Sequence, residues 1–139
     1  MKHIFNTGNL KEIFFISFLI AMLQFKVEAQ EQKPDSKQLV LNIKFKASPE
    51  NSEKFRKVLL DLFDTISNEP NFVEAKVYQE LGKPGEFLVN ETWNDNIEHF
   101  LTVQMKKPYA LEYEKKLKEL NVDRSPAAYK VLGSYKKKR

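Results

Sequence analysis

Glu91 and Trp93 are the two residues of this sequence whose types and spacing point most directly to chemistry. They lie two positions apart in the run FLVNETW, which has the composition of a β-strand, so their side chains point to the same face. A carboxyl held beside an indole, away from water, is a base with a raised pKa. The alternative is an ion pair between Glu91 and a lysine at a strand edge, with Trp93 as an ordinary core aromatic. The pair is therefore a candidate proton acceptor beside a candidate wall for a planar ligand.

Three further kinds of polar side chain are candidates for ligand binding or proton transfer. His99 follows Asn96 by three residues in a predicted helix, which suits either a solvated imidazole or a proton acceptor. Asn42 lies within a predicted strand, where its amide is either hydrated or orients a ligand oxygen. Tyr109 and Tyr113 are one helical turn apart, so they either pack in the core or clamp an aromatic ligand.

The composition excludes several familiar kinds of chemistry. Cysteine is absent, which rules out disulfides, thiolate catalysis and cysteine-ligated zinc or iron–sulfur clusters. The two histidines are His3 and His99, and His3 falls in a segment that we expect to be removed, so no multi-histidine metal site can form. The glycines are scattered and form neither a phosphate-binding loop nor a dinucleotide fingerprint. We therefore expect no metal and no cofactor.

Residues 1–29 have the three parts of a secretory signal peptide. A basic start precedes an apolar run of eleven residues, 13–23, and Val27-Glu28-Ala29 supplies a cleavage pattern. The run is shorter than the ~20 residues that a membrane-spanning helix needs. We expect cleavage after Ala29 and export to the periplasm or the extracellular space, without stable membrane insertion. An uncleaved amphipathic anchor is the alternative.

The charge pattern argues against a nucleic-acid-binding surface. The 139-residue chain carries a formal charge of +4, and the terminal run 136–139 alone holds four basic residues. The rest of the chain is close to neutral, whereas nucleic-acid-binding domains carry a basic face. We expect 136–139 to be a solvated basic tail, 30–37 a flexible polar lead-in, and 38–135 a single domain.

Alternating hydrophobicity predicts four β-strands. The strands are expected at residues 38–46, 72–81, 87–93 and 128–135. In the second strand, Val73 and Val77 are expected on one face and Phe72 on the other. A tight turn over residues 82–85 makes the second and third strands an antiparallel hairpin.

Apolar residues at steps of three and four positions predict the helices. The first begins at Ser48-Pro49, a cap followed by proline, and ends at Asn68-Glu69-Pro70. A second helical region begins near Asp95 and is interrupted by Pro108. A further helix is expected over residues 109–120.

The resulting β-α-β-β-α-β order favours an α+β, ferredoxin-like fold. Its economical form is a four-stranded antiparallel sheet with the helices on one face. The first three strands place apolar side chains on both faces, so we expect the uncovered face to be an apolar partner surface. A two-fold homodimer that buries sheet against sheet would cover it.

Several short segments also match a known family. They are Glu69-Pro-Asn-Phe72, Tyr78, the turn 82–85, Phe87-Leu-Val-Asn-Glu91-Thr-Trp93 and Pro108-Tyr109. Over about residues 38–120 the sequence resembles the antibiotic biosynthesis monooxygenase (ABM) domain family, which includes quinol monooxygenase-like proteins. The resemblance implies a dimeric α/β barrel with a ligand cavity between sheet and helices. For some members it also implies oxygenation of quinols without metal or flavin.

The resemblance extends the set of candidate site residues. A histidine common in the family falls near Gln104 here, and a polar ring falls on Tyr109, while His99 aligns with neither. Either Glu91 or His99 would accept a proton. The implied substrate-binding residues are Trp93, Phe100, Gln104, Tyr109, Tyr113 and Asn42.

Two functions remain open at this point. One is an exported, cofactor-independent quinol or aromatic monooxygenase that uses dioxygen. The other is a non-catalytic small-molecule-binding or structural dimer, suggested by the missing family histidines. Haem degradation, known among similar proteins, is disfavoured because the required strand asparagine falls near Ile43, Asn42 is out of phase with it, and no histidine follows His99.

Overall fold

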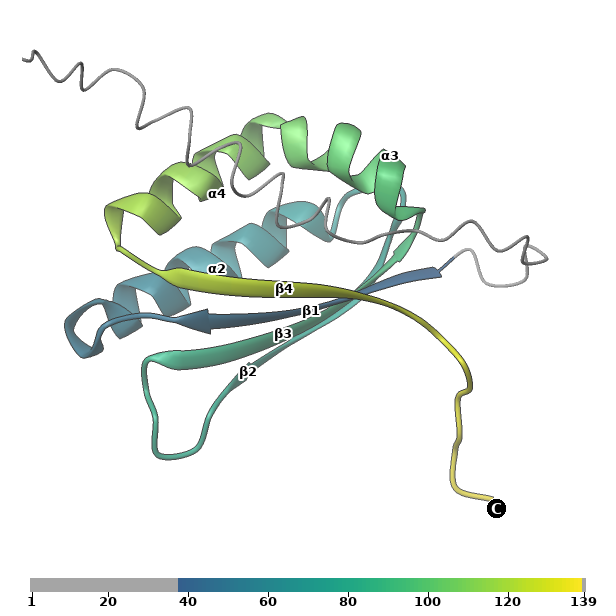
Figure 1. Cartoon of the computed structure of the whole chain (residues 1–139), viewed down its shortest axis with the longest axis horizontal. Helices are drawn as coiled ribbons and strands as arrows, with labels where there is room; N and C mark the ends of the chain where they lie inside the picture. Colours follow the sequence, from purple (N-terminus) through teal and green to yellow (C-terminus); the bar gives the residue numbers. More distant parts are fainter. Residues whose placement is uncertain (1–37, 139) are drawn as a thin grey trace, which may run out of the picture. The chain divides into compact units, whose positions relative to one another are not determined.

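The computed structural model describes residues 38–138 as a four-stranded antiparallel sheet with helices on one face (Figure 1). The strands are β1 (Gln38–Lys46), β2 (Phe72–Gln79), β3 (Glu86–Asn94) and β4 (Asp123–Lys130). The helices are η2 (Pro49–Asn51), α2 (Ser52–Ile66), α3 (Ile97–Thr102), η3 (Gln104–Lys106) and α4 (Pro108–Glu119). The predicted α+β, ferredoxin-like order is confirmed. The predicted signal peptide (1–29), the lead-in (30–37) and residue 139 lie outside the described residues.

β1 and β3 are the two central strands of the sheet. The order is β2-β3-β1-β4, and every neighbouring pair is antiparallel. Trp93 on β3 lies opposite Leu39 on one side and Phe72 on the other. The inward residues of β3 are buried at alternate positions, 87, 89, 91 and 93. Glu91 and Trp93 are thereby placed at the centre of the sheet, beneath the helices.

Two clusters of apolar side chains fill the space between the sheet and the helices. The first cluster contains Phe45, Ala47, Phe55, Leu59, Phe87, Val89, Tyr113 and Leu117. The second cluster contains Leu39, Leu41, Ile66, Trp93 and Phe100. α2 contributes to both clusters through the apolar stripe that its sequence predicts. None of the helices formed by residues 38–138 is long and apolar enough to cross a membrane.

Proline and asparagine mark the starts of the helices. Pro49 opens η2, which leads into α2, and Pro108 opens α4, where a missing N–H costs no hydrogen bond. α3 is capped by Asn96, whose Oδ1 accepts the backbone N–H of His99 at 2.9 Å. The short α3 and η3 thus occupy the helical region that the sequence places before Pro108.

The hairpin between β2 and β3 depends on two glycines. Gly82 has a φ of 79°, in the left-handed region that glycine adopts without a steric penalty. A Cβ at Gly85 would collide with the carbonyl oxygen of Ala47. The backbone N–H of Ala47 also donates to the Gly85 oxygen at 2.8 Å. The predicted tight turn is confirmed, and it joins the hairpin to the end of β1.

The predicted position of the last strand, 128–135, is wrong. β4 spans Asp123–Lys130 and includes Pro126, which lies opposite Ile43 of β1. Proline has no backbone N–H to donate to a neighbouring strand. β4 is an edge strand that pairs only with β1 in the sheet, so the missing N–H is tolerated. Residues 131–138 continue beyond β4 without regular structure (Figure 1).

The prediction that Phe72 and Val77 lie on opposite faces of β2 is also wrong. A register shift between Phe72 and Glu74 leaves Val73 as an extra residue, 42% exposed. Such a bulge turns the residues before it to the opposite face. Phe72 therefore points to the core, where its ring meets Trp93. Strict alternation could not reveal this, because one inserted residue reverses the pattern.

The sheet face away from the helices is mixed in character rather than apolar. Its side chains surround a concavity of about 390 Å³, lined by Val40, Asn42, Glu74, Lys76, Tyr78, Asn90, Thr92 and Tyr129. Polar and charged groups alternate there with aliphatic and aromatic ones. As predicted, no helix covers this face (Figure 1). The prediction that its side chains are apolar is wrong.

Candidate functional site

Glu91 and Trp93 share the inward face of β3, as their spacing predicted. Trp93 is 1% exposed and Glu91 is 5% exposed. The indole packs against the rings of Phe72 and Phe100, with centroids 5.3 and 5.4 Å away. Its Nε1 has no hydrogen-bond partner of normal geometry among residues 38–138. Trp93 is thus a core aromatic whose N–H lies near enough to the Glu91 carboxyl to lower its pKa.

The Glu91 carboxyl is held away from water inside the domain. Burial raises its pKa from 4.5 to about 7, and the nearby Trp93 N–H offsets only part of this effect. No cation contributes to the pKa of Glu91. The alternative of a strand-edge ion pair with lysine is wrong, because β3 is a central strand and Glu91 faces the core. Glu91 is therefore a carboxyl that changes charge near neutral pH.

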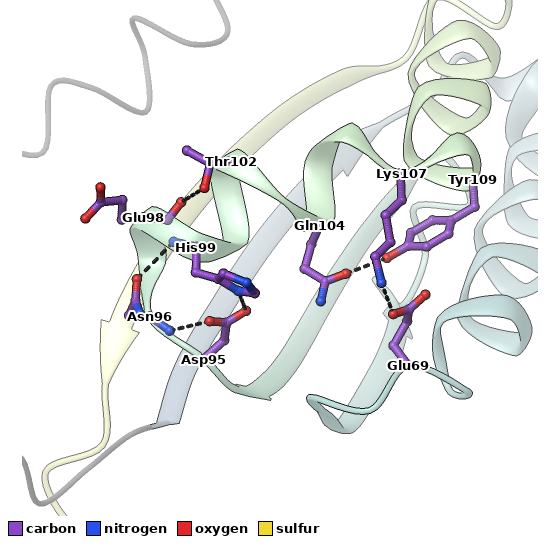
Figure 2. Close-up of polar contacts among 9 residues, drawn as sticks. All are labelled: Glu69, Asp95, Asn96, Glu98, His99, Thr102, Gln104, Lys107 and Tyr109. Atoms are coloured by element: carbon purple, nitrogen blue, oxygen red, sulfur yellow. Dashed lines mark hydrogen bonds and ion pairs between the residues drawn. The ribbon is translucent and has the colours of Figure 1, made fainter.

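Gln104 and Tyr109 form a polar contact at the junction of η3 and α4. The Tyr109 hydroxyl donates to Gln104 Oε1 at 3.1 Å, and Figure 2 shows the two side chains directed at each other. Burial, together with the negative charges of Glu69 and Glu91, raises the pKa of Tyr109 to about 12. The influence of Glu91 links this contact electrostatically to the carboxyl on β3.

Tyr113 lies one turn further along α4, in the first core cluster. Its ring packs edge-on against Phe45, and its buried hydroxyl has no hydrogen-bond partner among residues 38–138. Burial raises the pKa of Tyr113, and the charge of Glu91 adds to the rise. The Tyr113 hydroxyl is therefore a buried donor without a protein partner among residues 38–138.

His99 lies at the surface and is oriented by Asp95. The imidazole Nδ1 is 2.8 Å from Asp95 Oδ2, with the His99 side chain 44% exposed and the Asp95 side chain 5% exposed (Figure 2). Asp95 Oδ1 accepts the backbone N–H of Asn96 at 2.8 Å, which fixes the carboxylate. A carboxylate that holds one imidazole nitrogen leaves the other free for proton exchange. Asp95 is not among the site residues predicted from the sequence, although its i, i+4 spacing from His99 is a usable signal.

An ion pair between Glu69 and Lys107 was also missed. Lys107 Nζ contacts Glu69 Oε2 in a partly buried position, which joins the turn before β2 to the residue that precedes α4 (Figure 2). The two residues are far apart in sequence, so no local pattern could have paired them. The contact fixes the end of the chain segment that carries Gln104 and Tyr109.

Asn42 lies on the opposite face of the sheet from Glu91. Its Nδ2 donates to Asn90 Oδ1 at 2.7 Å, and both amides line the concavity on that face. Asn42 therefore cannot share a ligand with the interior residues unless the sheet itself opens.

The structure brings together six of the eight predicted site residues. Between the sheet and the helices lie Glu91, Trp93, Phe100, Gln104, Tyr109 and Tyr113. His99 is at the outer surface of α3, and Asn42 is on the far side of the sheet. Among residues 38–138, no three or more histidine and acidic side chains gather as a candidate metal site.

Residues 38–104 match the sequence model of the family "antibiotic biosynthesis monooxygenase", or ABM. Over these residues the chain is similar to the ABM domain. The resemblance that rested on the E-x-W pattern of Glu91 and Trp93 is thereby confirmed. A Pestalotiopsis microspora protein whose name assigns it as a monooxygenase is 28% identical over 80 residues, which cover 58% of this chain and 67% of that protein.

Solved structures share the architecture of this domain. One is assigned as an antibiotic biosynthesis monooxygenase from Deinococcus radiodurans, with 25% identity, a TM-score of 0.63 and coverage of 73% of this chain and 99% of that chain. Another is SnoaB, a cofactor-independent oxygenase from Streptomyces nogalater, with 15% identity, a TM-score of 0.63 and coverage of 71% of this chain and 97% of that chain. The likeness to SnoaB is one of fold.

The raised pKa of Glu91 makes stability depend on pH. Because the folded state binds this proton more tightly than the unfolded state, the stabilisation is complete below pH 4.5 and is lost as pH rises through about 7. We expect the free energy of unfolding to fall by roughly 3 kcal/mol more in the wild type than in Glu91→Gln between pH 5 and pH 8. Urea unfolding at both pH values measures the difference. Glu112→Gln, an exposed control on α4, should behave as the wild type, and equal pH dependence in all three proteins would contradict the burial effect.

Proposed function

We propose that this ABM domain is a cofactor-independent monooxygenase that oxidises a quinol-type aromatic with dioxygen. The observation that carries the proposal is the desolvated Glu91 carboxyl beside the N–H of Trp93. A base whose pKa lies near the working pH is the group that proton abstraction from a quinol requires. The quinol itself supplies the electrons, so the protein has to bind, deprotonate and desolvate it.

The reaction balances with dioxygen as the sole oxidant. For 1,4-naphthohydroquinone, one oxygen atom enters the ring to give 2-hydroxy-1,4-naphthoquinone, and the other leaves as water. The quinol gives up all four electrons that dioxygen accepts. In the first step Glu91 takes the hydroxyl proton, and the electron-rich anion then reduces dioxygen and combines with it. The protonated Glu91 returns its proton to the peroxide oxygen, and loss of water forms the quinone.

The remaining interior residues have binding roles in this proposal. Trp93 and Phe100 supply flat apolar surface against an aromatic ring. Tyr109 and Gln104 lie at the helical end of the interior, and Tyr113 offers a buried hydroxyl. His99, oriented by Asp95, is the alternative proton acceptor and is placed to exchange protons with solvent.

The comparisons support the class of reaction. The family name, the Pestalotiopsis microspora relative and the Deinococcus radiodurans structure all carry the monooxygenase assignment. SnoaB, which has the same fold, is described as a cofactor-independent oxygenase. Absence of a cofactor in this chain's reaction is part of the proposal.

A non-catalytic binding protein is the second candidate, and one observation favours it. Trp93 is enclosed by Phe72 and Phe100 and is almost inaccessible, as in a solid core. A protein that kept the fold and lost the reaction would retain such packing. Turnover therefore separates the two functions.

The proposal includes a homodimer formed through the open sheet face. That face carries aliphatic and aromatic side chains and a concavity, with no helix over it. A two-fold interface would pair each such face with itself. The proposal also includes export, supported by the basic start, the apolar run and the cleavage pattern of residues 1–29.

Turnover is tested with the purified protein and 1,4-naphthohydroquinone. We expect oxygen uptake above the uncatalysed rate, with kcat/KM rising through about pH 7 as Glu91 becomes a carboxylate. Glu91→Gln should lower kcat by about 10² to 10⁴, while the exposed Glu112→Gln should not. Binding without oxygen uptake would instead establish the non-catalytic function. If His99→Gln abolishes turnover and Glu91→Gln does not, the base is His99.

The dimer is tested by sedimentation equilibrium. We expect the wild type to sediment as a dimer and Thr92→Arg to dissociate it, because a two-fold axis would bring two buried positive charges together. Thr102→Arg, on the exposed surface of α3, is the matched control. A wild type that stays monomeric at high concentration rules the interface out.

Export is tested by expressing the full chain and identifying the N-terminus of the secreted fraction. We expect the mature protein to begin at Gln30. Ala29→Arg should block cleavage because a small residue is required immediately before the cut, whereas Glu28→Gln should not. Full-length protein retained in the cytoplasm would contradict the prediction.

A further inference from the structure

Positive charge is concentrated at the C-terminal end of the sequence. After Asp123 there is no acidic residue, but there are six basic ones: Arg124, Lys130, Lys136, Lys137, Lys138 and Arg139. Residues 38–123, by contrast, contain twelve basic and fifteen acidic residues. The domain that carries the candidate site is therefore slightly acidic, and the segment that follows it is strongly basic. A block of like charge of this kind is typical of a segment that contacts an anionic partner.

The C-terminal segment, residues 131–138, is exposed along its whole length. Figure 1 shows it continuing from the end of β4 and running away from the helices. Lys136, Lys137 and Lys138 form no ion pair within residues 38–138. The acidic residues of the domain do not pair with these lysines, so their charge is available to another surface.

Large apolar side chains lie next to these lysines. Leu132 is 88% exposed and Tyr135 is 95% exposed, so neither is covered by the domain. Such side chains are stabilised when they leave water. Apolar and basic groups close together are typical of segments at a lipid–water interface, where the apolar groups enter the acyl boundary and the ammonium groups stay at the headgroups.

The combination of charge and apolar groups favours a lipid surface over a polynucleotide. Polynucleotides are bound mainly through their phosphates by a basic face, and an aliphatic side chain such as Leu132 gains nothing from a phosphate backbone. The slightly acidic domain is repelled by either partner. Fully extended, residues 131–138 span at most ~28 Å, whereas charges are screened beyond ~8 Å at physiological salt. The segment can therefore contact a bilayer while the domain stays outside the range of repulsion.

We propose that the C-terminal segment binds the surface of an anionic lipid bilayer. Leu132 and Tyr135 enter the interface, and Lys136, Lys137 and Lys138 contact the headgroups. Binding is reversible and superficial, because the segment lacks the ~20 apolar residues of a membrane-spanning helix. It is independent of the proposed reaction. It keeps the domain beside the lipid phase, into which apolar aromatic compounds partition.

Co-sedimentation of the full chain with lipid vesicles tests the electrostatic contact. Vesicles of phosphatidylglycerol and phosphatidylcholine in equal parts are compared with phosphatidylcholine alone, which gives the binding due to other segments such as the apolar run 13–23. We expect the triple variant Lys136→Gln, Lys137→Gln and Lys138→Gln to bind the anionic vesicles about 10²-fold more weakly, at about fivefold per basic residue. The preference for anionic vesicles should disappear at ~1 M salt.

The matched control removes the same charge from the domain instead. The triple variant Lys54→Gln, Lys106→Gln and Lys118→Gln changes three exposed lysines, on α2, η3 and α4. We expect it to bind the anionic vesicles as the wild type does. Equal losses in the two triple variants would overturn the proposal, because net charge rather than the C-terminal segment would then govern binding.

A fluorescent reporter tests the apolar contact. Trp93 is buried and is the single tryptophan of the chain, so Tyr135→Trp adds a reporter within the segment. We expect anionic vesicles to shift its emission to shorter wavelength and to leave the emission of the wild type unchanged. The double variant Leu132→Ser and Tyr135→Ser should bind about tenfold more weakly than the wild type.

Two results would overturn the proposal and leave the proposed reaction untouched. One is an unshifted emission of Tyr135→Trp in the presence of anionic vesicles. The other is a wild type that binds a single-stranded polynucleotide but shows no preference for anionic over neutral vesicles, which would identify a nucleic acid as the partner of the segment.

Discussion

The site depends on one constraint, the removal of the Glu91 carboxyl from water. β3 is a central strand, with β1 and β2 on its two sides and the helices over its inward face, so a residue at this position has no route to solvent along the sheet. A carboxyl in that position is stabilised in its neutral form, and it is not paired with a cation that would reverse the effect. Ionisation of this buried carboxyl above neutral pH therefore lowers the stability of the fold.

The polar contacts on the helical side serve to hold the segment between β3 and α4 over this carboxyl. Asp95 fixes the beginning of that segment through His99 and the backbone of Asn96. Lys107 fixes its end through Glu69. Each pair joins one well-buried carboxylate to a more exposed cationic or imidazole group, which costs less desolvation than burying both partners. The result is a short, irregular helical region with defined ends, where a single regular helix would have been interrupted by Pro108.

Whether a residue number on a strand is odd or even decides which face of the sheet a predicted site residue lies on. Odd-numbered residues of β3 face the helices and even-numbered ones face the open side, so Glu91 and Asn90 belong to different environments although they are neighbours in sequence. The same rule separates Asn42 from Leu41 on β1. The interior therefore presents acid–base and aromatic groups, whereas the open face presents amides, charges and tyrosines suited to contact with another surface.

The sequence by itself determined the strands, the helices, the tight hairpin turn and the shared face of Glu91 and Trp93, because these follow from periodicities of two and 3.6 residues and from local turn chemistry. It did not reveal the bulge at Val73, because one inserted residue reverses the alternation, or the strand through Pro126, because edge position is a property of the whole sheet. The Glu69–Lys107 pair and the burial of Glu91 were likewise decided by tertiary structure. Both depend on which distant segments cover a residue, and the residues next to Glu91 in the sequence do not indicate that its carboxyl is removed from water.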